Sequence, residues 1–169
     1  LRSGKGYPYE GGLRVPWIVR WPGRAAAGAV SEQLVTSVDL LPTILEAAGT
    51  EAPEDVELDG YSMLPWLDAG AEIFDRTLWW HFPHYRGRDV TPWSAVRRGD
   101  WKLIRRDEGG CELYDLAKDP GERHDLSLER PVVAADLDSR LESALAAVAA
   151  RRPKANPEHR ALPRVLLLG

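Results

Sequence analysis

The sequence predicts an α/β protein whose C-terminal half is a small four-stranded antiparallel sheet packed on a helix. Four short runs rich in β-branched and aromatic residues follow one another closely, and turn residues separate them. A long segment with helical apolar spacing comes after the last run. Parallel neighbours would need long crossover connections, so the close spacing of the runs favours an antiparallel sheet.

A further strand and helix are predicted before that sheet. Residues 13–21 are largely apolar, β-branched and aromatic, and we expect them to form a mostly buried strand. Pro22 and Gly23 should end this strand. The following helix can be capped by one of three residues, namely Thr36, Ser37 or Asp39. Gly49 is a natural C-terminal stop. We expect the apolar face of this helix to comprise Leu41, Ile44, Leu45 and Ala48.

The predicted sheet begins after an acidic, turn-rich boundary at residues 50–60. Its strands are expected at residues 77–82, 93–98, 101–106 and 112–116. Gly99 and Asp100 form a tight hairpin between the second and third strands, and residues 107–110 turn the third into the fourth. Within the sheet, we expect Trp93 and Trp101 to fill the core and Cys111 to pack at a strand start.

The C-terminal helix is predicted to begin at Pro131, because proline is favoured in a first helical turn. Its apolar stripe comprises Val133, Leu137, Leu141, Leu145 and Val148. Asp136 and Arg140 are spaced to pair on another face. Such a helix would cover one face of the sheet.

Composition excludes several classes of function. The net charge of −4 argues against a broad attraction to nucleic acid or to an anionic membrane. No apolar run is long enough to span a bilayer. Cys111 is the single cysteine, which excludes an intrachain disulfide and a thiolate zinc cluster. No spacing of His, Asp and Glu resembles a metal site.

Lys5 is the strongest candidate for a chemical role. It lies in the glycine-rich segment 4–12, just before the predicted strand. Glycines let a backbone approach a ligand closely, and a lysine there supplies a compact cation for an oxyanion. The alternative is that Lys5 is an ordinary solvated surface lysine, because most lysines in proteins are exposed to solvent.

The order of short motifs along the chain resembles the sulfatase family, the arylsulfatase-like members of the alkaline phosphatase superfamily. The motif around Lys5 extends to Arg14 and Pro16 and is followed by Trp21-Pro22-Gly23. The later motifs are Asp39-Leu40-Leu41-Pro42-Thr43, Leu58-Asp59-Gly60, Gly99-Asp100-Trp101-Lys102-Leu103, Glu112-Leu113-Tyr114-Asp115-Leu116 and Asp119-Pro120-Gly121-Glu122. Any one of them is a weak signal, whereas their shared order is a strong one.

The resemblance implies hydrolysis of sulfuric esters, with Lys5 contacting the sulfate group. Sulfatases use a formylglycine nucleophile made within a Cys/Ser-x-Pro/Ala-x-Arg motif, and a calcium ion. Cys111 lacks that motif, and the family's nucleophile and calcium ligands lie upstream of the point that matches Leu1. The chain therefore looks like the C-terminal portion of a sulfatase, and we expect it to be inactive alone.

The same resemblance predicts the domain organisation. Residues 1–55 would be a fragment of the large α/β catalytic domain, residues 56–152 the small sheet and helix, and residues 153–169 an irregular tail. The expected partner is a sulfated small molecule or carbohydrate. Because residues 13–50 present faces shaped for a larger sheet, we also expect self-association. Family members are often exported, although no signal peptide pattern follows Leu1.

A second candidate region is the aromatic segment 78–85. Strand alternation puts Trp79 and His81 on one face and places Leu78, Trp80 and Phe82 on the other. Aromatic strand residues usually fill a core and a single histidine is usually just hydrogen-bonded. The resemblance, however, puts this region at the mouth of the active site and makes His81 and His84 candidate substrate-binding residues.

The charged residues near these candidates have structural alternatives. Arg86 and Arg88 could add charge to the rim of the site, although solvated arginines are commoner. Glu10 is expected to hold a turn and to pair with Arg14. A helix cap and a turn explain Asp39 and Asp59.

Two alternative functions stay open at this point. A phosphate or phosphonate monoester hydrolase of the same superfamily would share the fold and the lysine-rich pocket. A non-catalytic module that binds a partner or a carbohydrate is the alternative outside enzymes. An upstream Cys/Ser-x-Pro/Ala-x-Arg motif would argue against such a module.

Overall fold

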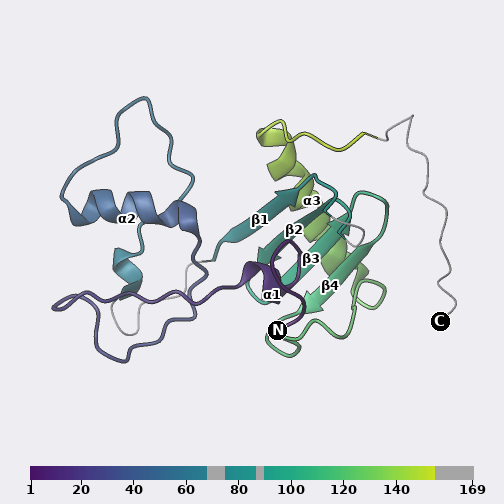
Figure 1. The fold of residues 1–169 in the computed structure, drawn as a ribbon, viewed down its shortest axis with the longest axis horizontal. Coiled ribbons are helices and arrows are strands. Elements are labelled where there is room, and N and C mark those ends of the chain that lie inside the picture. Colours follow the sequence, from purple (N-terminus) through teal and green to yellow (C-terminus); the bar gives the residue numbers. More distant parts are fainter. Residues whose placement is uncertain (68–74, 87–89, 155–169) are drawn as a thin grey trace, which may run out of the picture. The chain divides into compact units, whose positions relative to one another are not determined.

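The computed structural model describes residues 1–67, 75–86 and 90–154, and these form two compact units (Figure 1). The first unit comprises Leu1–Leu13, Trp79–Arg97 and the described residues from Trp101 onward. The second comprises Arg14–Leu78 together with Arg98–Asp100. Most of the predicted tail, residues 153–169, lies outside the described residues, and the predicted domain boundaries stay a prediction.

The predicted four-stranded antiparallel sheet is confirmed. Its strands are β1 (Thr77–Phe82), β2 (Trp93–Arg98), β3 (Trp101–Arg106) and β4 (Cys111–Asp115), in the spatial order β1-β2-β3-β4. Gly99 has a φ of 56° in the hairpin between β2 and β3, a conformation that glycine adopts without strain. Cys111 begins β4 but is exposed, so its predicted packing is wrong. It is the first residue of β4, which is an edge strand, and it pairs with Arg105 of β3.

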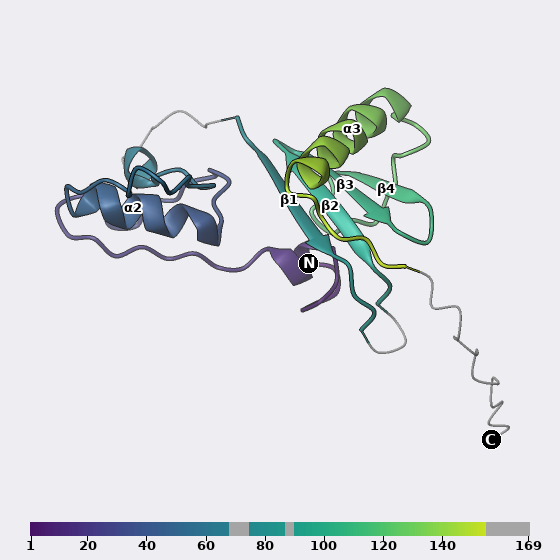
Figure 2. The same cartoon turned by 90° about the horizontal axis from the view of Figure 1, so that it is seen from above.

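Helix α3 (Pro131–Ala147) covers one face of the sheet, as Figure 2 shows. Leu137, Leu141 and Leu145 are buried against the side chains that β2, β3 and β4 direct to this face, Val96, Leu103 and Leu113. The predicted pair of Arg140 with Asp136 is present at 2.8 Å. Val148 is the exception in the predicted stripe, because it follows the last helical residue and is exposed.

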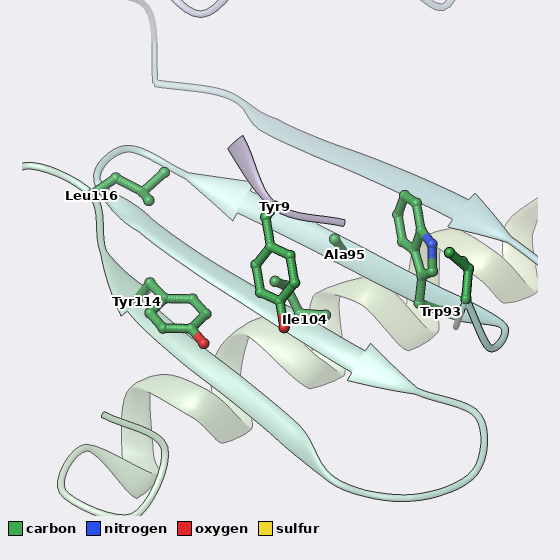
Figure 3. Close-up of a cluster of buried hydrophobic side chains, with 7 residues drawn as sticks. Tyr9, Trp93, Ala95, Ile104, Tyr114 and Leu116 are labelled. Atoms are coloured by element: carbon green, nitrogen blue, oxygen red, sulfur yellow. The ribbon is translucent and has the colours of Figure 1, made fainter. Parts of the chain in front are cut away.

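The N-terminal segment 1–13 covers the opposite face of the sheet. Figure 3 shows Tyr9 in front of the strands and α3 behind them. Tyr9 belongs to a buried cluster with Val90, Trp93, Ala95, Ile104, Tyr114 and Leu116. Trp80 and Phe82 of β1 pack against this cluster, and Phe82 stacks on Trp93 with ring centroids 5.6 Å apart. The predicted burial of Trp93 is confirmed, and Trp101 packs, partly buried, on the α3 side. Below, the face covered by segment 1–13 is called the Tyr9 face.

The predicted strand at residues 13–21 is wrong. Leu13 ends the short helix α1 (Glu10–Leu13), and residues 14–21 contain no strand. Ile18 is 90% exposed and Val15 is 68% exposed. A strand needs a neighbour to pair its backbone N–H and C=O groups. Among the described residues no strand pairs with this segment, so its apolar sequence has no sheet to join.

Helix α2 (Leu40–Ala47) of the second unit forms where it was predicted, and Gly49 follows it with a φ of 66°. Asp39 accepts a hydrogen bond from the Thr36 N–H at 2.7 Å, which is the reciprocal contact of a capping box at the 3-10 turn Ser37–Asp39 before α2. The same buried carboxylate accepts from the Tyr61 N–H at 3.0 Å and from Arg76 Nη1 at 2.7 Å. Asp39 stands at the N-cap position of α2 without a side-chain hydrogen bond to that helix, and its carboxylate forms a buried ion pair that the sequence did not suggest.

Much of the apolar surface of the second unit is exposed. Leu40, Leu41 and Ile44 of α2 are among its exposed apolar side chains. A groove of about 310 Å³ runs between α2 and the segment 17–21, and its lining includes Trp17, Ile18, Leu40, Met63 and Leu67. In the described part of the chain, no helix has the length and apolarity that a membrane span needs.

Candidate functional site

The loop that carries Lys5 is closed by its own backbone. The Gly11 N–H donates to Arg2 O at 2.9 Å, and the Tyr7 N–H donates to Gly4 O at 3.1 Å. A Cβ atom on Gly11 would lie 2.3 Å from Ser3 O, and one on Gly12 would lie 2.2 Å from Tyr7 O. The Glu-Gly-Gly motif therefore reflects a close backbone approach that no other residue type permits.

Lys5 is exposed on this loop, while the carbonyl groups of Lys5 and Gly6 are each held by a hydrogen bond. Arg86 Nη1 donates to Lys5 O at 2.6 Å, and Trp93 Nε1 donates to Gly6 O at 3.1 Å. No carboxylate of the described residues lies within ion-pair distance of the Lys5 ammonium group. The loop thus presents, on a fixed backbone, a cation that no carboxylate of residues 1–67, 75–86 or 90–154 neutralises.

A buried ion network fastens the loop to the sheet. Lys102 Nζ of β3 lies 2.9 Å from Glu10 Oε1 and 2.8 Å from Glu122 Oε1. Glu122 Oε2 also accepts the Glu10 N–H at 2.6 Å, and the Lys102 side chain is 0% exposed. Arg97 approaches Glu10 Oε2 at 3.4 Å, so two carboxylates face two cations. Buried charges are stable only when they are paired in this way.

This network corrects the predicted partner of Glu10. The sequence analysis did not predict the network itself. Glu10 has the structural role expected of it, but its partners are Lys102 and Arg97 instead of Arg14. Helix α1 buries Glu10 against the sheet, whereas Arg14 belongs to the second unit and is exposed. The position of Lys102 in its strand could have indicated a buried ion pair. Lys102 lies two positions before Ile104, so both side chains point to the same face of the sheet, and that face is buried.

A second cluster, around Glu112 of β4, ties the same segment to the Tyr9 face. Glu112 Oε2 accepts from the Tyr9 hydroxyl at 2.9 Å and the Tyr114 hydroxyl at 2.6 Å, and Arg106 Nη2 lies 2.8 Å from Oε1. Burial opposes ionisation of Glu112, but hydrogen bonds from Tyr114, Arg106 and Tyr9 outweigh it and lower the pKa of Glu112. Burial, together with the Glu112 hydrogen bond, raises the pKa of Tyr114 above its usual value.

The lowered pKa of Glu112 predicts a pH-dependent contribution to stability. A carboxylate whose folded pKa is depressed stabilises above its unfolded pKa of about 4.3 and loses that contribution as pH falls through the folded value. Glu112→Gln should therefore lower the free energy of unfolding at neutral pH and reduce its loss on acidification, measured by urea unfolding between about pH 7 and pH 3. Glu108→Gln is the control, because Glu108 also accepts a tyrosine hydroxyl, from Tyr85 at 3.0 Å, but at an exposed position. Equal acid sensitivity of Glu112→Gln and the unmodified chain would contradict the prediction.

The two candidate histidines lie in different surroundings. His81 Nδ1 is 2.8 Å from Ser94 Oγ, and His81 Nε2 is 2.8 Å from Arg151 O. Ser94 alternates with Trp93 and Ala95, whose side chains lie on the Tyr9 face, so His81 lies on the α3 side of the sheet. The structure therefore does not bring His81 together with Lys5. Its two hydrogen bonds hold the segment that follows α3.

His84 is connected to the Lys5 loop through aromatic side chains. It is exposed just beyond β1, and its ring packs edge-on against Phe82 with centroids 5.4 Å apart. Phe82 stacks on Trp93, which donates to Gly6 O. The structure thus links His84, Arg86 and the Lys5 loop at the Tyr9 face. Arg88 lies outside the described residues.

Comparison with known proteins decides the family. The model of the C-terminal region of N-sulphoglucosamine sulphohydrolase matches residues 4–151, which is most of the chain. The chain belongs to the sulfatase family. It is 36% identical over 148 residues to human arylsulfatase A and 37% identical over 142 residues to a sulfatase of Formosa agariphila. These alignments cover 75% and 78% of this chain but 28% and 26% of those relatives, so it spans about a quarter of their length.

Solved structures share the fold of this sulfatase chain. BT4656, solved in complex with its substrate D-glucosamine-2-N,6-O-disulfate, is 28% identical with a TM-score of 0.65, over 80% of this chain and 29% of that one. Ps i-CgsB is also 28% identical, with a TM-score of 0.71 over 85% and 31% of the two chains. The chain therefore corresponds to the C-terminal region of the family, as the order of its motifs predicted.

Among residues 1–67, 75–86 and 90–154, no group of three or more His, Cys, Asp or Glu side chains is arranged to hold a metal ion.

Proposed function

We propose that this chain serves a sulfuric ester hydrolase as the region that supplies the sulfate-binding lysine, Lys5, and part of the substrate pocket. One observation carries the proposal. The Lys5 ammonium group has no carboxylate partner among the described residues, although Arg86 and Trp93 fix the carbonyl groups of Lys5 and Gly6. A cation on a fixed glycine-rich loop, without a carboxylate partner in the described ranges, suits a sulfate oxygen.

The chemical role of Lys5 is electrostatic. Charge builds up on the transferring oxygens during sulfate ester cleavage, and a preorganised cation stabilises it without reorganisation at the moment of reaction. The Glu10–Lys102–Glu122 network supports this role because it keeps the loop in place before substrate arrives. Lys5 then contributes most strongly when the rest of the enzyme excludes water from the site.

The substrate we propose is a sulfated carbohydrate or small molecule. BT4656, a structural relative, was solved with a disulfated glucosamine as its substrate. We propose that His84 contacts such a ligand, because it is exposed and is linked to the Lys5 loop through Phe82 and Trp93. The role of His81 in substrate binding stays a prediction, and its two hydrogen bonds within the chain favour a structural role.

In the longer enzyme, we propose that upstream residues supply the formylglycine nucleophile and the calcium ligands.

The experiment is to assay the 169-residue chain, and a longer gene product that contains it, against an aryl sulfate and the matching aryl phosphate. We expect turnover of the sulfate by the longer protein and none by the chain alone. Faster turnover of the phosphate would favour a phosphate or phosphonate hydrolase. A gene that encodes only this chain would favour a binding module.

We also propose that the chain self-associates through the apolar surface of its second unit. Ile18 and Ile44 are largely exposed, and burying such side chains is favourable at about 25 cal/mol per Å². Sedimentation at micromolar concentrations should show dimers or larger species, and the double substitution Ile18→Asp and Ile44→Asp should shift them towards monomer. Exchanging the exposed Val132 of α3 for Asp is the control and should leave association unchanged. A monomeric chain that binds no hydrophobic dye would contradict the proposal.

A further inference from the structure

Arg86 is fixed at both its backbone and its guanidinium group. Its backbone N–H donates to Val90 O at 2.9 Å, and its carbonyl accepts from the Val90 N–H at 3.3 Å. At the other end, Nη1 donates to Lys5 O at 2.6 Å. An exposed arginine that is tethered twice differs from a freely solvated one, because much of its conformational entropy is already lost.

Gly6 provides the space that the guanidinium group occupies. Its φ is 96°, and a Cβ atom at this position would lie 2.1 Å from Arg86 Nη1. The guanidinium group is thus packed on the Lys5–Gly6 peptide, and a side chain at residue 6 would displace it. This explains why Lys5 is followed by a glycine.

The charges around this contact are unbalanced. Other cations of the first unit that lie near the Tyr9 face are neutralised, Lys102 by Glu10 and Glu122, and Arg106 by Glu112. Within the described residues, neither Lys5 nor Arg86 has a carboxylate at ion-pair distance. Two cations joined at one peptide group, with no counter-ion from the described part of the chain, attract an anion that has several oxygens.

We propose that Arg86 is a second substrate-binding residue, which donates hydrogen bonds to the anionic oxygens of the sulfated substrate beside Lys5. A guanidinium group has five N–H donors in a planar fork, and Lys5 O uses one of them. The remaining donors suit two oxygens of a sulfate group, a geometry that a lysine does not offer. The inference rests on the proposed function of Lys5 and extends it to a two-cation site.

The test compares Arg86→Met, Arg86→Lys and Lys5→Ala in the longer sulfatase that contains this chain. Arg86→Met should raise KM for an aryl sulfate and Ki for inorganic sulfate by about tenfold, the loss expected for one charge-assisted contact, with a smaller fall in kcat. Arg86→Lys should recover only part of this binding. Arg123→Met, at an exposed arginine elsewhere in the first unit, is the matched control and should change neither constant.

The outcomes separate the two proposals. Unchanged KM and Ki in Arg86→Met, together with a large loss in Lys5→Ala, would overturn the role of Arg86 and leave that of Lys5 intact. Unchanged kinetics in Lys5→Ala would overturn the proposed function itself. A fall in kcat alone, with Ki for sulfate unchanged, would show that Arg86 only positions Lys5 and would also overturn the inference. Because Arg86 is exposed, its variants should unfold at the urea concentration of the unmodified chain, which checks that each one folds.

Discussion

Exchanging Lys102 for methionine should cost the first unit about 3–5 kcal/mol of its free energy of unfolding, the loss typical when one partner of a buried ion network is removed. The side chain of Lys102 is wholly buried, and Nζ is shared between Glu10 and Glu122. Without it, two buried carboxylates would lie close together, with Arg97 3.4 Å from Glu10 as the remaining ion-pair partner among the described residues. Hydrogen exchange of the β3 amides measures this loss in the first unit alone.

Lys118→Met is the matched control for that substitution. Lys118 makes an ion pair of similar length, 2.7 Å to Asp115, but its side chain is 84% exposed. Its loss should cost at most about 1 kcal/mol, as for other exposed pairs. Adding Glu10→Gln to Lys102→Met should restore part of the stability, because one buried unpaired charge is removed. Equal costs for Lys102→Met and Lys118→Met would show that the buried network does not stabilise the fold.

The local part of the fold could be predicted from the sequence. Turn residues and alternating apolar residues predicted β1, β2 and β3 with their observed bounds, and β4 to within one residue. Pro131 and Gly49 likewise predicted where α3 begins and where α2 is followed by a left-handed glycine. Predictions of these features are correct because the features depend on neighbours a few residues away in the chain.

The predictions that were wrong or missing concern features that depend on residues far apart in the sequence. The apolar segment 13–21 forms no strand because nothing in the described chain pairs with it. Glu10 and Lys102 are 92 residues apart, so no local pattern indicated that they would meet. The same holds for Lys5 and Arg86, which are 81 residues apart. The sequence therefore suggested Lys5 as a site residue but not the contacts that fix its position.

Exchanging Lys5 for alanine should lower turnover of sulfate esters by the longer enzyme on the order of 10²-fold or more, comparable to the loss of one oxyanion donor. The ammonium group would be missing where charge builds up on the transferring oxygens. Stability should change little, because the Lys5 side chain is exposed and takes part in neither hydrogen bond of its loop, from Arg86 to Lys5 O or from the Tyr7 N–H to Gly4 O. Steady-state kinetics with an aryl sulfate and a thermal unfolding scan of the same preparation measure both quantities.

Two comparisons make this prediction specific to the chemistry of Lys5. Lys154→Ala removes an exposed lysine outside the loop and should leave turnover unchanged. Lys5→Arg keeps the positive charge but should recover only part of the rate, because a planar guanidinium fork does not replace a compact ammonium group in a tight loop. Gly6 also leaves room for one guanidinium group, that of Arg86, so a second one at position 5 would compete for the same space. Normal turnover in Lys5→Ala would remove Lys5 from the site, and full recovery in Lys5→Arg would show that charge alone, without the geometry of this loop, determines the rate.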